Sequence, residues 1–258
     1  MSIKRKDFDS YLNGLLKPEN FKDSAHNGLQ VEGRNIIGRI AFTVSASKEA
    51  IESAVKKKAD TIIAHHGIIW KGNELRTFTG AFANRLFPLV KNDINLYGFH
   101  LPLDAHTEIG NNYVIASQLK LQDIQPFAEY NGNTIGFMGR FASPVKVLDL
   151  EKELAKLFKR EIVVSSYNKK ASIKTIGIVS GGAGAEWHFA QKCNLDAYLT
   201  GEISENIWHD AMEGHVHLFA CGHHATERTG ICALMEKIKN DFKNSNIECF
   251  FIDSENPV

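Results

Sequence analysis

Short apolar runs alternate with helix-type patterns along most of this sequence. The run RIAFTVSAS at 39–47 is typical of a strand that ends in a serine-rich turn. The segment 48–59 follows with apolar residues at helical spacing, and DTIIAHHG at 60–67 is typical of a second strand. A strand, a helix and a strand in this succession form a βαβ unit, which predicts a parallel sheet.

The same alternation continues along the chain and predicts an α/β fold with two halves of similar size. A strand that leads into a loop is expected at 94–104, a strand with a glycine turn at 174–184, and further strands at 195–202 and 215–222. Further helices are expected at 111–121, 147–158, 185–193 and 225–242. The segment 130–146 is rich in glycine and asparagine, which favours a domain junction there. We therefore expect one α/β domain at 1–128 and a second at 129–258, with a chain that could cross between them.

Residue composition, net charge and the length of the apolar segments exclude several classes of protein. Hydrophobic residues make up 43% of the chain and charged residues 23%, as in an ordinary globular protein. Lys and Arg together number 30, as do Asp and Glu, so no global positive field attracts nucleic acid or an anionic membrane. The N-terminus lacks the apolar segment of a secretory signal, and no apolar run approaches the roughly 18–20 residues that span a bilayer. We expect a cytoplasmic protein with reduced thiols and no membrane partner.

The candidate chemistry follows the predicted strands. His65 and His66 come after one strand, Asp104 after the next, and His223 and Glu227 after the strand at 215–222. Because ligands of open α/β sheets bind beyond the carboxyl ends of the strands, these side chains are placed to meet a ligand. If the last helix begins near residue 225, His223 and Glu227 lie one turn apart on one face.

This combination of donors favours a transition-metal site. Imidazole nitrogens together with carboxylate oxygens suit Zn, Fe, Mn, Ni or Co better than Ca or Mg, and the sequence does not choose among the five. A histidine that follows a strand is more often an ordinary turn residue. Two histidine doublets, each after an apolar run, are hard to produce by chance, so a metal site and ordinary turn histidines both stay open as interpretations.

Four motifs give the sequence a family resemblance. They are NGLQVEG at 27–33, IIAHHGIIW at 62–70, HLPLDAHTEIGNN at 100–112, and TGEISENIWHDAMEGHVHLFACGHHATERTGI at 200–231. In this order they resemble the dinuclear-metal family of type 2 homologues of GTP cyclohydrolase 1, also called Ngg-interacting-factor-three-like proteins. The resemblance runs from about residue 8 to the C-terminus. The sequence departs from the family at His26, where a proline is frequent.

The resemblance implies a fold, an assembly and a ligand set. It implies two similar interleaved α/β domains with mainly parallel or mixed sheets and a metal site between them, and a toroidal homohexamer. Two divalent transition-metal ions would bind to each chain. His65 would share one ion with His223, His66 would join Asp104 on the other, and Glu227 would bridge both.

Other candidate residues are weaker. His100 and His106 flank Asp104 and could help by donating to a substrate, or could equally pack the loop. His224 is expected to point away from the ions, and Cys221 to be a small buried residue rather than a thiolate. The glycine turn in SGGAGAEW at 180–187 could cradle an anion, although an ordinary strand–turn–helix connection is the simpler interpretation.

Two classes of function remain open from the sequence. The first is a metal-dependent hydrolase. By resemblance it would be like a type 2 GTP cyclohydrolase, in which metal-activated water opens the imidazole ring of the purine; a phosphatase or nuclease fits the same ligands. The second is a non-catalytic metal-binding ring that binds a partner. A small nucleotide is the expected substrate, and the zero net charge argues against general binding of nucleic acid.

Overall fold

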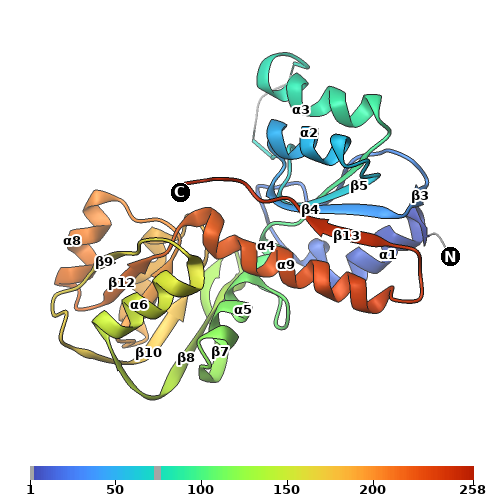
Figure 1. Cartoon of the computed structure of the whole chain (residues 1–258). Coiled ribbons are helices and arrows are strands. Elements are labelled where there is room, and N and C mark those ends of the chain that lie inside the picture. The colour runs from blue at the N-terminus through green and yellow to red at the C-terminus, as the bar shows by residue number, and fades with distance from the viewer. Residues whose placement is uncertain (1–2, 73–76) are drawn as a thin grey trace. The chain divides into compact units, whose positions relative to one another are not determined.

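A computed structural model describes residues 3–72 and 77–258 of the chain (Figure 1). The chain forms two compact units: the first contains the residues up to Ile109 together with Ile231–Glu255, and the second contains Gly110–Gly230 with Asn256–Val258. The division after Ile109 differs from the expected one after residue 128, because the helix that follows Gly110 buries Ile115 and Ala116 in the core of the second unit.

The first unit is built on a five-stranded mixed sheet with the order β13-β4-β5-β6-β2. Its strands are β2 (Gly28–Val31), β4 (Arg39–Ser45), β5 (Thr61–His66), β6 (Asn95–Gly98) and β13 (Glu248–Phe251); β1 (Ile3–Lys4) and β3 (Ile36–Ile37) form a separate pair. Strands β13, β4, β5 and β6 are parallel, and only β2 is antiparallel to its neighbour. The predicted parallel pairing of 39–47 with 60–67 is confirmed.

Helices cover both faces of this sheet. They are α1 (Arg5–Leu16), α2 (Lys48–Lys56), α3 (Gly80–Lys91), the short α4 (Leu101–Asp104), the 3-10 turn η1 (Pro18–Asn20) and the later part of α9 (His223–Asp241). Phe8 and Leu12 of α1 pack with Leu234 of α9 on one face, whereas Ile51 of α2 and Leu89 of α3 belong to the core on the other. The unit is therefore a three-layer α/β/α sandwich.

Local sequence explains where α2 begins and ends. The side chain of Ser47 accepts a hydrogen bond from the amide of Ala50 at 3.1 Å and caps the helix. Ala50 and Ile51 are buried. The predicted helix 48–59 ends earlier, at Lys56, because Lys58 adopts a left-handed conformation with φ 57°.

The second unit is built on a six-stranded mixed sheet with the order β7-β8-β10-β11-β12-β9. Its strands are β7 (Gln122–Tyr130), β8 (Asn133–Lys146), β9 (Val163–Ser165), β10 (Ser172–Ile178), β11 (Ala197–Thr200) and β12 (His217–Ala220). Its helices are α5 (Asn111–Gln118), α6 (Val147–Phe158), η2 (Gly184–Glu186), α7 (Trp187–Lys192), α8 (Glu205–Glu213) and the start of α9. Strands β10, β11 and β12 are parallel.

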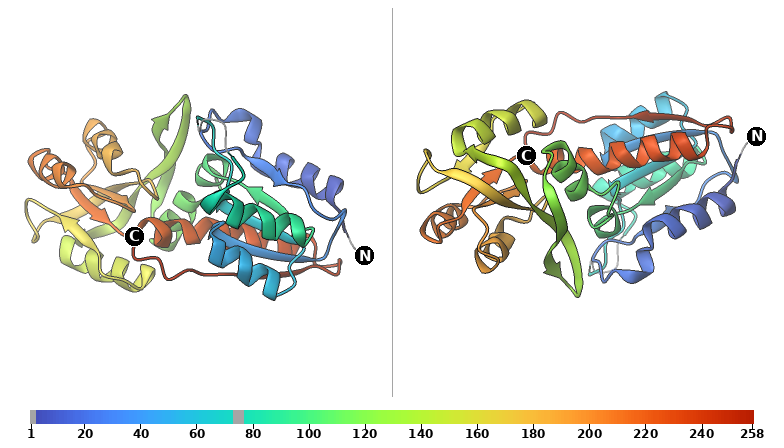
Figure 2. Two further views of the ribbon diagram at one scale, coloured as in Figure 1. Left: turned by 90° about the horizontal axis from the view of Figure 1, so that it is seen from above. Right: turned by 90° about the horizontal axis from the view of Figure 1, so that it is seen from below.

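The layers of the second unit follow from the alternation of its strands. Leu199 of β11 packs into a core with Ile115 of α5 and Leu154 of α6. The next side chain toward the N-terminus, Tyr198, points to the other face and contacts Phe127. Figure 2 shows β7 and β8 as a long green hairpin and α9 as one unbroken helix from orange to red. The predicted α/β class with mixed sheets is confirmed in both units.

Two predicted segments differ from the structure. The strand expected within 94–104 is present as β6, but the loop expected after it contains the helix α4 at Leu101–Asp104, whose Pro102 lies in the first turn, where a missing amide hydrogen costs nothing. The segment 130–146, expected as a domain junction, contains the 14-residue strand β8. Its glycines serve close packing instead: a Cβ on Gly136 would lie 2.4 Å from the carbonyl oxygen of Ile178 on the neighbouring strand.

No helix in the described part of the chain is long and apolar enough to cross a membrane.

Candidate metal centre

The first unit gathers polar side chains at the carboxyl edge of its parallel strands. His65 and His66 are the last residues of β5, and Ser45, the last residue of β4, is paired with His66. Phe99 and His100 directly follow β6, which is the next parallel strand of the sheet. This is the edge at which α/β sheets bind ligands.

His65 is held rigidly inside the protein. Its side chain is fully buried, and its Nδ1 lies 2.9 Å from the carbonyl oxygen of Phe99. Its Nε2 lies 3.6 Å from Oδ2 of Asp104, which is also buried. A backbone carbonyl at Nδ1 fixes the ring orientation and directs Nε2 toward a ligand position, as in metal-binding histidines. Asp104 reaches this position because α4 turns the chain immediately after β6.

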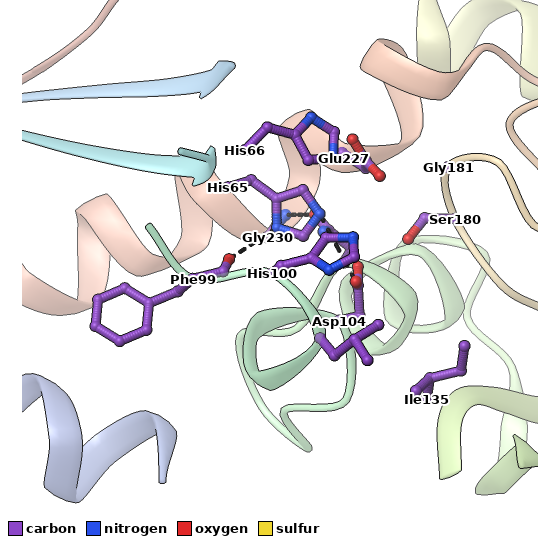
Figure 3. A network of polar contacts seen from close by, with 12 residues as sticks. His65, His66, Phe99, His100, Asp104, Ile135, Ser180, Gly181, Glu227 and Gly230 are labelled. Carbon is purple, nitrogen blue, oxygen red and sulfur yellow. Dashed lines mark hydrogen bonds and ion pairs between the residues drawn. The ribbon is translucent and has the colours of Figure 1, made fainter. Parts of the chain in front are cut away.

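His66 is half-buried and lies beside His65, with the ring centroids 4.7 Å apart. Its Nδ1 lies 3.1 Å from Oγ of Ser45, so the hydroxyl orients this ring as the carbonyl of Phe99 orients that of His65. Figure 3 shows both rings beside Asp104 and His100.

His100 is oriented by a carboxylate. Its Nδ1 lies 2.9 Å from Oδ1 of the buried Asp23. Burial by itself would raise the pKa of the Asp23 carboxyl, but its hydrogen bond and charge interaction with His100 hold that pKa well below the usual range. Asp23 is therefore an anion that fixes one nitrogen of the His100 ring.

The second unit holds candidate donors at the carboxyl ends of its parallel strands. His223 is the first residue of α9, which begins two residues earlier than the predicted start at 225, and Glu227 lies one turn later, with its Oε1 3.1 Å from Nε2 of His223. Nδ1 of His223 contacts the carboxylate of Glu202, which follows β11. His223 is thus oriented by a carboxylate, and Glu227 is 3% exposed.

The electrostatics at His223 favour positive charge. Burial would lower the pKa of this imidazole, but the hydrogen bonds and charges of Glu227 and Glu202 raise it to about 9. Two carboxylates around one ring, one of them buried, are the setting that a bound cation requires.

Two glycines allow the backbone to pack closely against His223 and Glu227. Gly181 adopts φ +71°, and a Cβ there would lie 2.3 Å from Oε1 of Glu227. A Cβ on Gly201 would lie 2.6 Å from Cα of His223. The glycine turn 180–187 therefore packs against the donor pair, which explains its composition without a bound anion.

Each unit thus holds part of the predicted site. The first unit brings His65, His66 and Asp104 together, and the second brings His223 and Glu227 together. Imidazoles combined with buried carboxylates are the donors that Zn and the other divalent transition metals prefer, so these residues fit such ions.

The structure also describes the surroundings of the weaker candidates. Nδ1 of His106 accepts hydrogen bonds from the amides of Glu108 and Ile109 at 3.1 and 3.3 Å, so this ring stabilises its own loop. His224 is buried. Cys221 is fully buried, and burial raises the pKa of its thiol, as expected of a small core residue.

Sequence reasoning missed the residues that orient the donors: Asp23, Ser45 and Glu202. Glu202 follows a predicted strand in the same way as the histidines, so its position carried a usable signal. Ser45 likewise lies at the end of the strand predicted at 39–47, whereas Asp23 lies 77 residues from the ring that it contacts and no local pattern marks it.

Comparisons with known proteins agree with this fold. A family model described as Duf34/NIF3 (NGG1p interacting factor 3) matches residues 3–257. A GTP cyclohydrolase 1 type 2 homolog of Pasteurella multocida (strain Pm70) is 40% identical over 252 residues, covering 98% of both chains. The homolog of Escherichia coli (strain K12) is 36% identical over 259 residues, covering 99% of this chain and all of the relative.

Solved structures show the same fold. The structure of protein ybgI, of unknown function, is 36% identical with a TM-score of 0.91, covering 99% of this chain and all of the other. That of TTHA1606 from Thermus thermophilus is 30% identical with a TM-score of 0.88 and the same coverage. Because the family model and these relatives extend over nearly the whole chain, the protein belongs to the Duf34/NIF3 (NGG1p interacting factor 3) family.

Proposed function

We propose that this chain is a metal-dependent hydrolase with two divalent transition-metal ions held by His65, His66, Asp104, His223 and Glu227. The observation that carries the proposal is the orientation of the buried His65, whose Nδ1 is fixed by the carbonyl of Phe99 and whose Nε2 lies beside Asp104. In the proposed arrangement His65 and His223 bind one ion, His66 and Asp104 bind the other, and Glu227 bridges them.

The ions would supply the reactive chemistry, because a pair of divalent cations lowers the pKa of water to about 7 and stabilises developing negative charge. The protein contributes orientation and a low dielectric. His65, Asp104 and Glu227 are buried, which strengthens their interactions with cations. The carbonyl of Phe99, the hydroxyl of Ser45 and the carboxylate of Glu202 keep the imidazole donors in place.

We propose GTP as the first substrate to test, with hydrolytic opening of the purine imidazole ring as the reaction. This choice is supported by the names of the relatives, which are called GTP cyclohydrolase 1 type 2 homologs. A phosphatase or nuclease, and a non-catalytic metal-binding ring, are the alternatives that the experiment must separate.

The test is a turnover screen of the metal-loaded chain against GTP, other nucleotides and simple phosphate esters. Release of formate from GTP, abolished by a chelator and by Glu227→Gln, is the expected result. Release of inorganic phosphate instead would identify a phosphatase. Two bound ions per chain without turnover of any substrate would favour the non-catalytic alternative, and a chain that binds no ion would overturn the proposal.

We also propose that the chain assembles as a homohexamer. Exposed apolar side chains on and beside α3 support contact with other copies, since Phe78, Phe87 and Val90 are 63%, 56% and 56% exposed. Light scattering after size exclusion should give a particle of six chains of 28.8 kDa each. A monomer under the same conditions would contradict this assembly.

A further inference from the structure

His100 is a third imidazole at the edge where β5 and β6 end. One donor nitrogen from each of His65, His66 and His100 can be chosen so that all three lie within 4.8 Å of one another. The rings of His65 and His100 have centroids 5.1 Å apart, and those of His66 and His100 lie 5.6 Å apart (Figure 3). The five proposed ligands do not include His100.

The orientation of the His100 ring is fixed by Asp23, which several other hydrogen bonds hold in place. Its Nδ1 lies 2.9 Å from Oδ1 of Asp23. Asp23 also accepts hydrogen bonds from the amides of Ala25 and Leu101 and from the side chain of Asn27, at 3.0, 3.0 and 2.9 Å. A buried carboxylate with this many partners cannot rotate freely, so the ring that it holds is fixed as well.

The three rings share one pattern of anchoring. Nδ1 contacts a backbone carbonyl in His65, a hydroxyl in His66 and a carboxylate in His100. Within residues 3–72 and 77–258, Nε2 of His100 has no hydrogen-bond partner. An imidazole that is held at one nitrogen by a carboxylate and presents the other to neighbouring donors is typical of a metal ligand.

We propose that His100 is a sixth ligand, which binds through Nε2 the ion assigned to His66 and Asp104, with Asp23 as its positioning residue. This inference rests on the proposed function. Apart from the bridging Glu227, the ligands of this ion then belong to the first unit, so its binding does not depend on His223. Two imidazoles and two carboxylates are a set that holds Zn or Fe(II).

The distance between the two imidazoles is compatible with this assignment. Donor nitrogens around a tetrahedral zinc ion lie about 3.3 Å apart, given bond lengths of about 2.0–2.1 Å. One nitrogen of His66 and one of His100 lie no more than 4.8 Å apart, so a movement of the His66 side chain by about 1.5 Å or less would bring them to this spacing while Asp23 holds His100.

The test uses the full chain in the His223→Ala background, where we expect one bound ion per chain. The affinity for Zn²⁺ is measured by competition with a chromophoric chelator, and the coordination is followed by the visible absorption of Co²⁺. Adding His100→Ala should weaken Zn²⁺ binding by about 10- to 100-fold or more and change the Co²⁺ spectrum. Adding Asp23→Asn should weaken binding less, with the ligand count unchanged.

The matched control is His209→Ala, which removes a 57%-exposed histidine of α8 and should leave the affinity unchanged. The inference is overturned if His223→Ala binds no ion, or if His100→Ala leaves the affinity and the spectrum as they were. If the inference is overturned in this way, two ions in the unaltered chain would still support the proposed function.

Circular dichroism shows whether a variant is folded. If His100→Ala is unfolded, Asp23→Asn decides the outcome, and an affinity for Zn²⁺ that is unchanged in Asp23→Asn overturns the inference.

Discussion

The two units present their donors in different ways. In the first unit His65 and His66 are the last residues of a central strand, and neighbouring segments of the same sheet edge supply the groups that orient them. In the second unit His223 and Glu227 lie on the first turn of a helix, and Glu202 orients His223 from the end of a strand. In the first unit the pairing of the strands sets the positions of the two histidines. In the second unit the i, i+4 spacing of the helix sets the positions of His223 and Glu227, and the backbone of Gly181 and Gly201 packs against them.

This difference predicts different sensitivities. Donors at a strand end depend on hydrogen bonds from the segments on either side. Donors on a helix depend on the backbone that packs against the helix, because Gly181 and Gly201 leave no room for a Cβ. Four experiments test the comparison.

The largest effect is expected from Glu227→Gln in the second unit. A neutral amide is a poor bridge, so the variant should lose at least one ion and about 100-fold or more in metal-dependent turnover while remaining folded. Metal analysis and circular dichroism measure both. Glu213→Gln, an exposed residue at the end of α8, is the control. Two ions still bound to Glu227→Gln would contradict the bridging role.

A smaller effect is expected when the orienting groups are removed. Glu202→Gln should weaken metal binding by about 10- to 100-fold, because a carboxylate that holds a ligand imidazole increases its basicity. Ser45→Ala should cost less, since the hydroxyl contact with His66 carries no charge. Chelator competition compares the two variants, and equal losses would show that the units orient their histidines equally strongly.

The glycine contact of the second unit is tested by Gly181→Ala. The positive φ and the 2.3 Å approach to Oε1 of Glu227 predict a loss of about 1–2 kcal/mol in the free energy of unfolding. Gly182→Ala is a matched control, because its Cβ would meet His223 only at 3.5 Å. Urea unfolding measures the free energy of unfolding of both variants. Equal values for Gly181→Ala and Gly182→Ala would show that close packing at Gly181 does not contribute to stability.

The smallest effect concerns His217, a buried histidine of β12 whose Nδ1 contacts Ser166. Burial lowers its pKa below 6.5, so the unfolded chain binds the proton more readily and the folded state loses stability as pH falls through 6.5. A tenfold difference in proton affinity between the two states corresponds to about 1.4 kcal/mol.

His217→Asn should therefore reduce the loss of melting temperature between pH 7 and pH 5. Part of that loss should remain, because burial also lowers the pKa of His106. An unchanged pH profile in the variant would show that His217 makes no contribution.

Local pattern predicted much of the fold. The helix at 147–158 begins and ends where its apolar periodicity places it, and the strands at 60–67 and 215–222 are present with slightly shorter bounds. The pattern did not show the helical turn at 101–104, where a loop was expected, and it failed at 130–146, where glycines in a long strand resemble a linker.

The sequence by itself determined the α/β alternation and which residues are candidate donors, because the spacing of apolar residues and the polar residues that follow strands are local properties of the chain. It also placed Glu227 one turn after His223, since helical spacing follows from sequence distance. Only the tertiary structure decided which groups fix the rings. Asp23 contacts His100 across 77 residues and Glu202 contacts His223 across 21, and contacts of this kind depend on how strands are paired rather than on any nearby pattern.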